Sequence, residues 1–132
     1  MRMKSLLCSF VVFLLPVLAI AQETPTISIE EIQICTSVQD RQPVGEDTSF
    51  ARDIGQLYCF TKLSSSYDTA SISHVWYYND KEMLRVELDV RAKKWRTWST
   101  KRIIDTWIGE WRVDVLSSDG NILASKQFTI QE

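Results

Sequence analysis

The strongest regularity in the chain is an alternation of apolar and charged residues across positions 82–91. The apolar positions are Leu84, Val86, Leu88 and Val90, and the charged positions between them are Arg85, Glu87, Asp89 and Arg91. Because successive side chains of a β-strand point to opposite faces, this pattern predicts a strand with one buried face and one solvated face.

Less regular segments of apolar and β-branched residues recur at 26–38, 55–63, 71–78, 95–102, 111–116 and 122–130. Residues 40–47 hold Pro43 and Gly45 among charged residues and are predicted to form a loop. Ser-Ser-Asp-Gly-Asn at 117–121 is a hairpin signal. Because no helical period follows the N-terminal apolar stretch, we expect an all-β fold. The spacing favours an antiparallel β-sandwich of about seven strands with immunoglobulin-like architecture.

Segment 26–38 changes its apolar phase partway along. Ile27 and Ile29 occupy odd positions, whereas Ile32 and Ile34 occupy even ones. A change of phase inside one strand predicts a β-bulge or a switch between sheets.

The N-terminus carries a different pattern. Arg2 and Lys4 precede an almost wholly apolar stretch at 6–20, and Ala-Ile-Ala at 19–21 is followed by polar residues. This order is typical of a secretory signal peptide that is cleaved after Ala21. The alternative, an uncleaved membrane anchor, needs roughly 20 apolar residues and so a longer stretch.

The predicted organisation is therefore a signal peptide at 1–21 and a single β-sandwich domain at 22–132, periplasmic or secreted. The leader would remove two of the 15 basic residues and none of the 17 acidic ones. An acidic exported domain is a poor candidate for nucleic-acid binding. No later apolar segment is long enough to cross a membrane, so no span is expected in the mature chain.

Two cysteines, Cys35 and Cys59, follow the predicted leader. A disulfide between them is plausible in an oxidising compartment. It would close a loop of about 25 residues and stabilise the fold by roughly 3 kcal/mol. The alternative is two separately buried thiols that pack as small apolar side chains. The sequence leaves both interpretations open.

The sequence lacks the signatures of catalysis and of metal binding. His74 is the only histidine and falls in a predicted strand, whereas a Ser–His–acid arrangement needs a nucleophile on a sharp turn beside its base. No ligand spacing suits a metal, and no glycine-rich loop suits a phosphate. We therefore expect a protein that is not an enzyme and needs no cofactor.

The remaining signal is aromatic and basic. All five tryptophans lie within 71–111, and 91–102 holds six basic residues and no acidic one. Aromatic rings stack on sugars, guanidinium groups bind carboxylates or phosphates, and the same composition is typical of protein-binding surfaces. The candidate binding residues are His74, Trp76, Arg96, Trp98 and Lys101.

Core packing is the competing interpretation of these residues. It is favoured for Trp76 and Trp111, because small sandwiches often fill their interiors with tryptophan. Trp95 and Trp98 lie on opposite faces of their segment, so one is expected in the core and the other at the surface. For His74, a buried and hydrogen-bonded position is favoured.

Several blocks of the chain resemble, in order, the bacterial family known as domain of unknown function 2914. They are Val-Gln-Asp-Arg-Gln-Pro (38–43), Leu-Tyr-Cys-Phe-Thr (57–61), His-Val-Trp-Tyr (74–77), Trp-Arg-Thr-Trp-Ser-Thr-Lys (95–101), Gly-Glu-Trp-Arg-Val (109–113) and Asp-Gly (119–120). The resemblance extends over about 32–130 and implies an exported or membrane-associated β domain without an assigned activity. The positions it singles out are Asp40, Arg41, Pro43, Phe60, His74, Trp76, Arg96, Ser99 and Lys101, which adds Ser99 to the candidate binding residues.

The favoured function is a non-catalytic extracytoplasmic binding module for a glycan or an acidic cell-envelope component. One alternative is a protein-interaction domain that uses the same residues on an envelope partner. Another is an enzyme of unrecognised type, with His74 as acid or base and Arg96 stabilising charge. An open groove at Arg96 and Trp98 would favour the first function.

Overall fold

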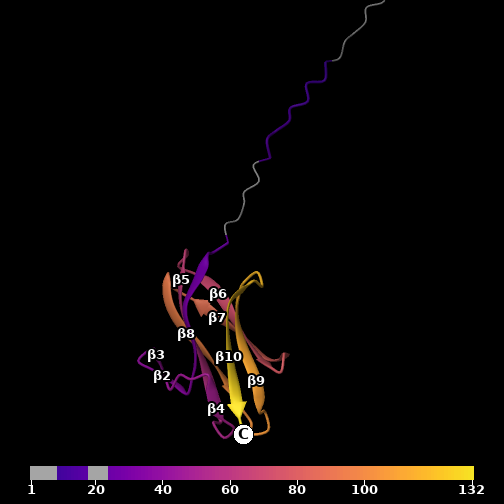
Figure 1. Ribbon diagram of the computed structural model, residues 1–132. Coiled ribbons are helices and arrows are strands. Elements are labelled where there is room, and N and C mark those ends of the chain that lie inside the picture. Colours follow the sequence, from indigo (N-terminus) through magenta and orange to yellow (C-terminus); the bar gives the residue numbers. More distant parts are fainter. Residues whose placement is uncertain (1–8, 18–23) are drawn as a thin grey trace, which may run out of the picture.

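The computed structural model describes residues 9–17 and 24–132. Residues 9–17, inside the apolar stretch of the predicted leader, form neither helix nor strand (Figure 1). Their side chains are exposed. The predicted cleavage site at 19–21 lies outside the described residues. Within both described ranges there is no helix long and apolar enough to cross a bilayer.

Residues 24–132 fold into two main β-sheets and a hairpin, which confirms the predicted all-β sandwich (Figure 1). The strands are β1 (Ile27–Cys35), β2 (Ser37–Gln39), β3 (Gln42–Val44), β4 (Ser49–Ala51), β5 (Gln56–Ser65), β6 (Ala70–Tyr78), β7 (Lys81–Val90), β8 (Lys94–Arg102), β9 (Gly109–Ser117) and β10 (Ile122–Gln131). One sheet has the order β1-β5-β8, the other has the order β4-β10-β9-β6-β7, and β2 pairs with β3.

The strand count and one pairing differ from the prediction. The described part of the chain has ten strands, because β2, β3 and β4 are each three residues long and too short to show alternation. β3 lies within the segment predicted to be a loop, 40–47. β4 pairs with β10 in parallel, whereas the other pairs are antiparallel.

The predicted irregularity in the first segment is a β-bulge. The register between β1 and β5 shifts between Ile29 and Glu31. Ile29 lies opposite Leu63 before the shift, and Ile34 lies opposite Cys59 after it. Directly opposed residues share a face of the sheet, and Leu63 and Cys59 are both fully buried. The bulge therefore keeps the apolar residues of β1 turned inward although their numbering changes from odd to even.

The interior between the sheets contains an aromatic cluster and an aliphatic cluster. In the aromatic cluster the rings of Trp111 and Phe128 stack at 5.8 Å, and Trp76 meets Phe128 edge-on at 6.1 Å. The aliphatic cluster consists of Leu63, Ile72, Val90 and Val115. On β6, Ile72 belongs to the aliphatic cluster and Trp76 to the aromatic one. His74 therefore lies where the two clusters meet.

The β2–β3 hairpin packs beside the three-stranded sheet (Figure 1). It turns at Asp40 and Arg41, whose positive φ angles of 49° and 59° suit a two-residue hairpin turn. Phe60 alternates with the inward-facing Cys59 and Thr61 along β5 and so faces outward, yet it is fully buried. Because β2 packs against β5, the hairpin accounts for a covered outer face.

Gly45, just after β3, is fixed by its neighbour as well as by its backbone. Its φ is +71°, and a Cβ added there would collide with the hydroxyl of Thr36. The backbone N–H and the hydroxyl of Thr36 both donate to the carbonyl of Val44, at 3.1 Å each. Gly55 has a similar φ of +80° with open space around it. Glycine is thus needed at position 45 because of both the positive φ and the contact with Thr36, and at position 55 because of the positive φ alone.

The possible bridge between Cys35 and Cys59 is not formed, and both are free, buried thiols. Cys35 lies opposite Tyr58, and Ile34 lies opposite Cys59. The two sulfur-bearing side chains therefore leave the sheet on opposite faces. Burial raises the pKa of Cys35 to about 11 and that of Cys59 further. Both thiols stay protonated at neutral pH and have little nucleophilic character.

Candidate functional site

The six predicted binding residues do not form one site. His74, Trp76 and Ser99 are in the interior, with at most 5 % of their surface exposed. Arg96 and Trp98 face outward from β8, and Lys101 lies on the inward side of the same strand. The structure thus separates a buried polar group from a surface group. It does not bring His74 and Arg96 together as an acid or base and a charge stabiliser.

The buried polar group is a network of hydrogen bonds between the two sheets. Nε2 of His74 lies 2.9 Å from the hydroxyl of Thr61, and Nδ1 lies 2.7 Å from the hydroxyl of Ser99. Nε1 of Trp76 donates to the same Ser99 oxygen at 3.0 Å. Thr61 and Ser99 belong to the three-stranded sheet, whereas His74 and Trp76 belong to the five-stranded one. Every bond of the network therefore crosses the core.

Burial and hydrogen bonding determine the state of His74. An indole N–H can only donate, so Ser99 accepts from Trp76. In a neutral imidazole one ring nitrogen donates and the other accepts, and the hydroxyls of Ser99 and Thr61 can complement either arrangement. Burial lowers the pKa of His74 to about 4, so the ring is neutral at physiological pH. These properties make His74 a structural residue, as the core-packing interpretation predicted.

Lys101 contacts an aromatic ring and is separate from Arg96. Its Nζ lies 4.6 Å from the ring centroid of Trp107 and donates to the carbonyl of Arg102 at 2.9 Å. Partial burial lowers the pKa of Lys101. Trp107 in turn contacts Trp111, with 5.9 Å between their ring centroids. Lys101 therefore covers one end of the aromatic cluster with its stem.

The surface group lies at a pocket on β8, the edge strand of the three-stranded sheet. We call it the Trp95 pocket. Its cavity measures about 290 Å³. The lining residues are Arg41, Lys62, Leu63, Lys94, Trp95 and Arg96. Four cationic side chains thus surround one half-buried indole.

The charges in this pocket are only partly neutralised. Glu30 pairs with Lys94 at 2.9 Å and lies 3.9 Å from Lys62. The hydrogen bond from Lys94 holds the pKa of Glu30 below its usual value. Arg41 places its guanidinium carbon 5.4 Å from the ring centroid of Trp95, and Arg96 donates to the carbonyl of Arg41 at 3.5 Å. Within the described ranges neither guanidinium has a carboxylate partner.

Trp95 brings a further unpaired group to the pocket. Its Nε1 is buried and has no hydrogen-bond partner among the residues that the structure describes. Buried donors are nearly always paired with protein or with ordered water. Trp95 packs against the aliphatic cluster, whereas Trp98 is 37 % exposed. This settles which of the two tryptophans faces solvent.

Apart from Arg96, the residues that line the Trp95 pocket were not among the candidate binding residues chosen from the sequence. Trp95 was counted only as a possible core residue, although it stands within the basic run 91–102. Arg41 was singled out only by the family resemblance. Lys62 stood out in the sequence only as one position of an alternating strand, which gives no sign of a binding role. The position of Arg41 beside Arg96 depends on long-range pairing, because 55 residues separate the two in the sequence.

The solved structures that the chain is similar to include several β-glucosidases. They include a β-glucosidase from Kluyveromyces marxianus (13 % identity, TM-score 0.46), a GH3 β-glucosidase from Bifidobacterium adolescentis (10 %, 0.46) and β-glucosidase 3B from Thermotoga neapolitana in complex with glucose (11 %, 0.45). The alignments cover 83, 80 and 81 % of this chain but only 14, 17 and 16 % of those proteins. No curated protein matches the chain.

One protein family matches the sequence directly, over residues 69–130. This range includes β6 to β9 and nearly all of β10, and thus the whole five-stranded sheet except β4, together with the edge strand of the Trp95 pocket. The match confirms the resemblance expected from the motifs between His74 and Gly120. The family that residues 69–130 match is described as "Protein of unknown function (DUF2914)".

Proposed function

We propose that the protein is a non-catalytic, extracytoplasmic binding module that recognises an anionic glycan through the Trp95 pocket. The observation that carries the proposal is the pair of guanidinium groups, Arg41 and Arg96, which flank an indole without a carboxylate of their own. Guanidinium groups bind carboxylates and phosphates through two parallel hydrogen bonds. An adjacent aromatic ring offers a flat surface for the sugar.

The balance of charge supports an anionic ligand. Glu30 is shared by Lys62 and Lys94, so one carboxylate faces four cations around the cavity. A bound carboxylate or phosphate would reduce the repulsion between these cations.

Titration calorimetry with the purified protein tests this proposal. The probes are polygalacturonate for carboxylate, glycerol-phosphate teichoic acid for phosphate, and dextran as the neutral control. We expect at least one anionic polymer to bind, with an affinity that falls as salt is added. Arg96→Ala should weaken this binding at least tenfold. Arg96→Lys should weaken it less than Arg96→Ala, because lysine keeps the positive charge, but it should still weaken it, because lysine cannot donate two parallel hydrogen bonds.

Arg85→Ala is the matched control. Arg85 faces outward from β7 on the other sheet and pairs with Glu82 at 2.7 Å, so its removal should leave the affinity unchanged. Equal binding of dextran and the anionic polymers would refute the proposal. So would equal losses in Arg96→Ala and Arg85→Ala.

A further inference from the structure

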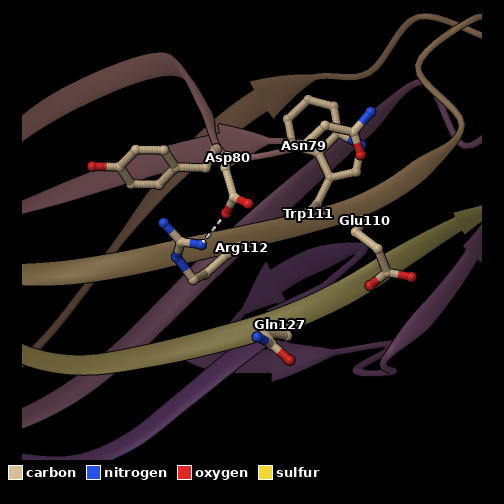
Figure 2. Close-up of a pocket in the computed structure, with 7 residues that line it drawn as sticks. Asn79, Asp80, Glu110, Trp111, Arg112 and Gln127 are labelled. Carbon is tan, nitrogen blue, oxygen red and sulfur yellow. Dashed lines mark hydrogen bonds and ion pairs between the residues drawn. The ribbon is translucent and has the colours of Figure 1, made fainter.

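A second pocket lies on the outward face of the five-stranded sheet (Figure 2). It shares no lining residue with the Trp95 pocket. We call it the Arg112 pocket. Its cavity measures about 350 Å³. Arg112 and Glu110 reach it from β9, and Gln127 reaches it from β10, directly opposite Arg112 in the register. Asn79 and Asp80 come from the turn between β6 and β7.

The guanidinium of Arg112 is held from three sides. Its Nη1 donates to Asp80 at 2.7 Å, and its Nε donates to Asp114 at 3.0 Å. Its central carbon lies 4.4 Å from the ring centroid of Tyr77. An arginine on a sheet surface normally moves among several rotamers, which makes binding costly in entropy. These contacts remove that freedom before any ligand arrives.

Asp114 shows that this arrangement differs from ordinary surface ion pairing. It faces outward from β9 but is only 5 % exposed. Besides the bond from Arg112, it accepts one from the hydroxyl of Ser125 at 2.6 Å. Removing a carboxylate from water is costly unless charged and polar partners compensate. Here both partners fix the carboxylate, which in turn positions the guanidinium in the pocket.

Several polar groups of the Arg112 pocket remain available. Nη2 of Arg112 has no hydrogen-bond partner in the described part of the chain, and neither do the side-chain amides of Asn79 and Gln127. Glu110 accepts only long hydrogen bonds, at 3.3 and 3.4 Å, from the hydroxyl of Thr129. The cavity therefore presents a donor, an acceptor and two amides that can do both.

We propose that the Arg112 pocket is a subsite for a neutral saccharide with neighbouring hydroxyl groups. A small anion there would meet Asp80 and Glu110, and a small cation would meet Arg112. A sugar hydroxyl both donates and accepts, so adjacent hydroxyls can bond to Glu110 and Arg112 at once. Polar groups that converge in a concave site give such a ligand its orientation. This subsite does not depend on the Trp95 pocket.

Nuclear magnetic resonance titration of the isotope-labelled protein provides the test. The probes are chitohexaose, cellohexaose, mannohexaose and maltohexaose, each raised to millimolar concentration. We expect at least one to shift the amide signals of residues 77–80, 110–112 and 127. Glu110→Gln and Gln127→Ala should each weaken that binding at least fivefold.

Glu87→Gln is the matched control, because it makes the same change at an outward position of the same sheet and should have no effect. Arg96→Ala should also leave neutral sugar binding intact, which separates this subsite from the anionic one. The proposal is overturned if none of the four sugars shifts these signals. It is also overturned if Glu87→Gln weakens binding as much as Glu110→Gln.

Discussion

Acidification should destabilise the protein through His74. The pKa of the ring is about 4 in the folded protein and 6.5 in the unfolded chain. Between these values the unfolded chain binds the extra proton, so stability is highest above pH 6.5 and falls as the pH drops towards 4. The full difference amounts to about 3 kcal/mol, of which about 2.5 kcal/mol should be lost by pH 4.5.

The assay is urea denaturation of the wild-type protein and of His74→Gln at pH 7.0, 5.5 and 4.5. Glutamine removes the titrating ring but leaves the carboxylates, such as Glu30, whose protonation also destabilises the fold at low pH. The variant should be less stable at pH 7, because its amide cannot reproduce both bonds of the ring. Its free energy of unfolding should nevertheless fall about 2.5 kcal/mol less than that of the wild type by pH 4.5.

Direct titration by nuclear magnetic resonance supplies an independent measurement, since His74 is the only histidine in the sequence. Its ring signals should remain those of the neutral form at pH 5.5. If the free energy of unfolding falls by the same amount in the wild type and in His74→Gln as the pH is lowered, this reasoning is refuted. A measured pKa near 6.5 in the folded protein would do so as well.

Three other outcomes are expected. Ser99→Ala should lower the free energy of unfolding by about 2 kcal/mol, because Trp76 loses its acceptor in the core, whereas Ser73→Ala on the same sheet as His74 should change it by less than about 0.5 kcal/mol. In urea denaturation, Gly45→Ala should lower the free energy of unfolding by at least about 1 kcal/mol more than Gly55→Ala does. Alanine is strained by the positive φ at both positions, but only at position 45 does its Cβ collide with Thr36. A reducing agent should leave the melting temperature unchanged, because the two buried cysteines are not bonded; a lower melting temperature would contradict this.

The strands with a strict period were predictable from the sequence because the period has a direct physical cause. The alternation at 82–91 corresponds to β7, Lys81–Val90, and the segment 71–78 corresponds to β6, Ala70–Tyr78. The phase change between Ile29 and Ile32 marked the bulge correctly, since an extra residue in a strand must shift every later side chain by one position.

Pairing between distant segments was not predictable in the same way. β2 and β3 are three-residue strands around a charged turn and have the composition of a loop. The parallel pairing of β4 with β10 joins residues about eighty positions apart. Local pattern carries no information on such contacts, because they depend on how the whole chain closes.

In the candidate site, too, local pattern was predictable from the sequence and contacts between distant segments were not. Period-two reasoning divided the residues of β8 between two faces, but it could not tell which face would meet the other sheet. Once Ser99 faces inward, it joins His74 and Trp76 in the core, and Arg96 must face outward. The Trp95 pocket also needed the hairpin, because Arg41 reaches it from a segment that the sequence suggested was a loop.

The hydrogen bonds of His74 have a consequence for the geometry of the whole molecule. Apolar layers tolerate sliding, whereas hydrogen bonds are directional and hold one sheet at a fixed offset from the other. The two pockets lie on different sheets, so this internal tie also keeps the spacing between them constant.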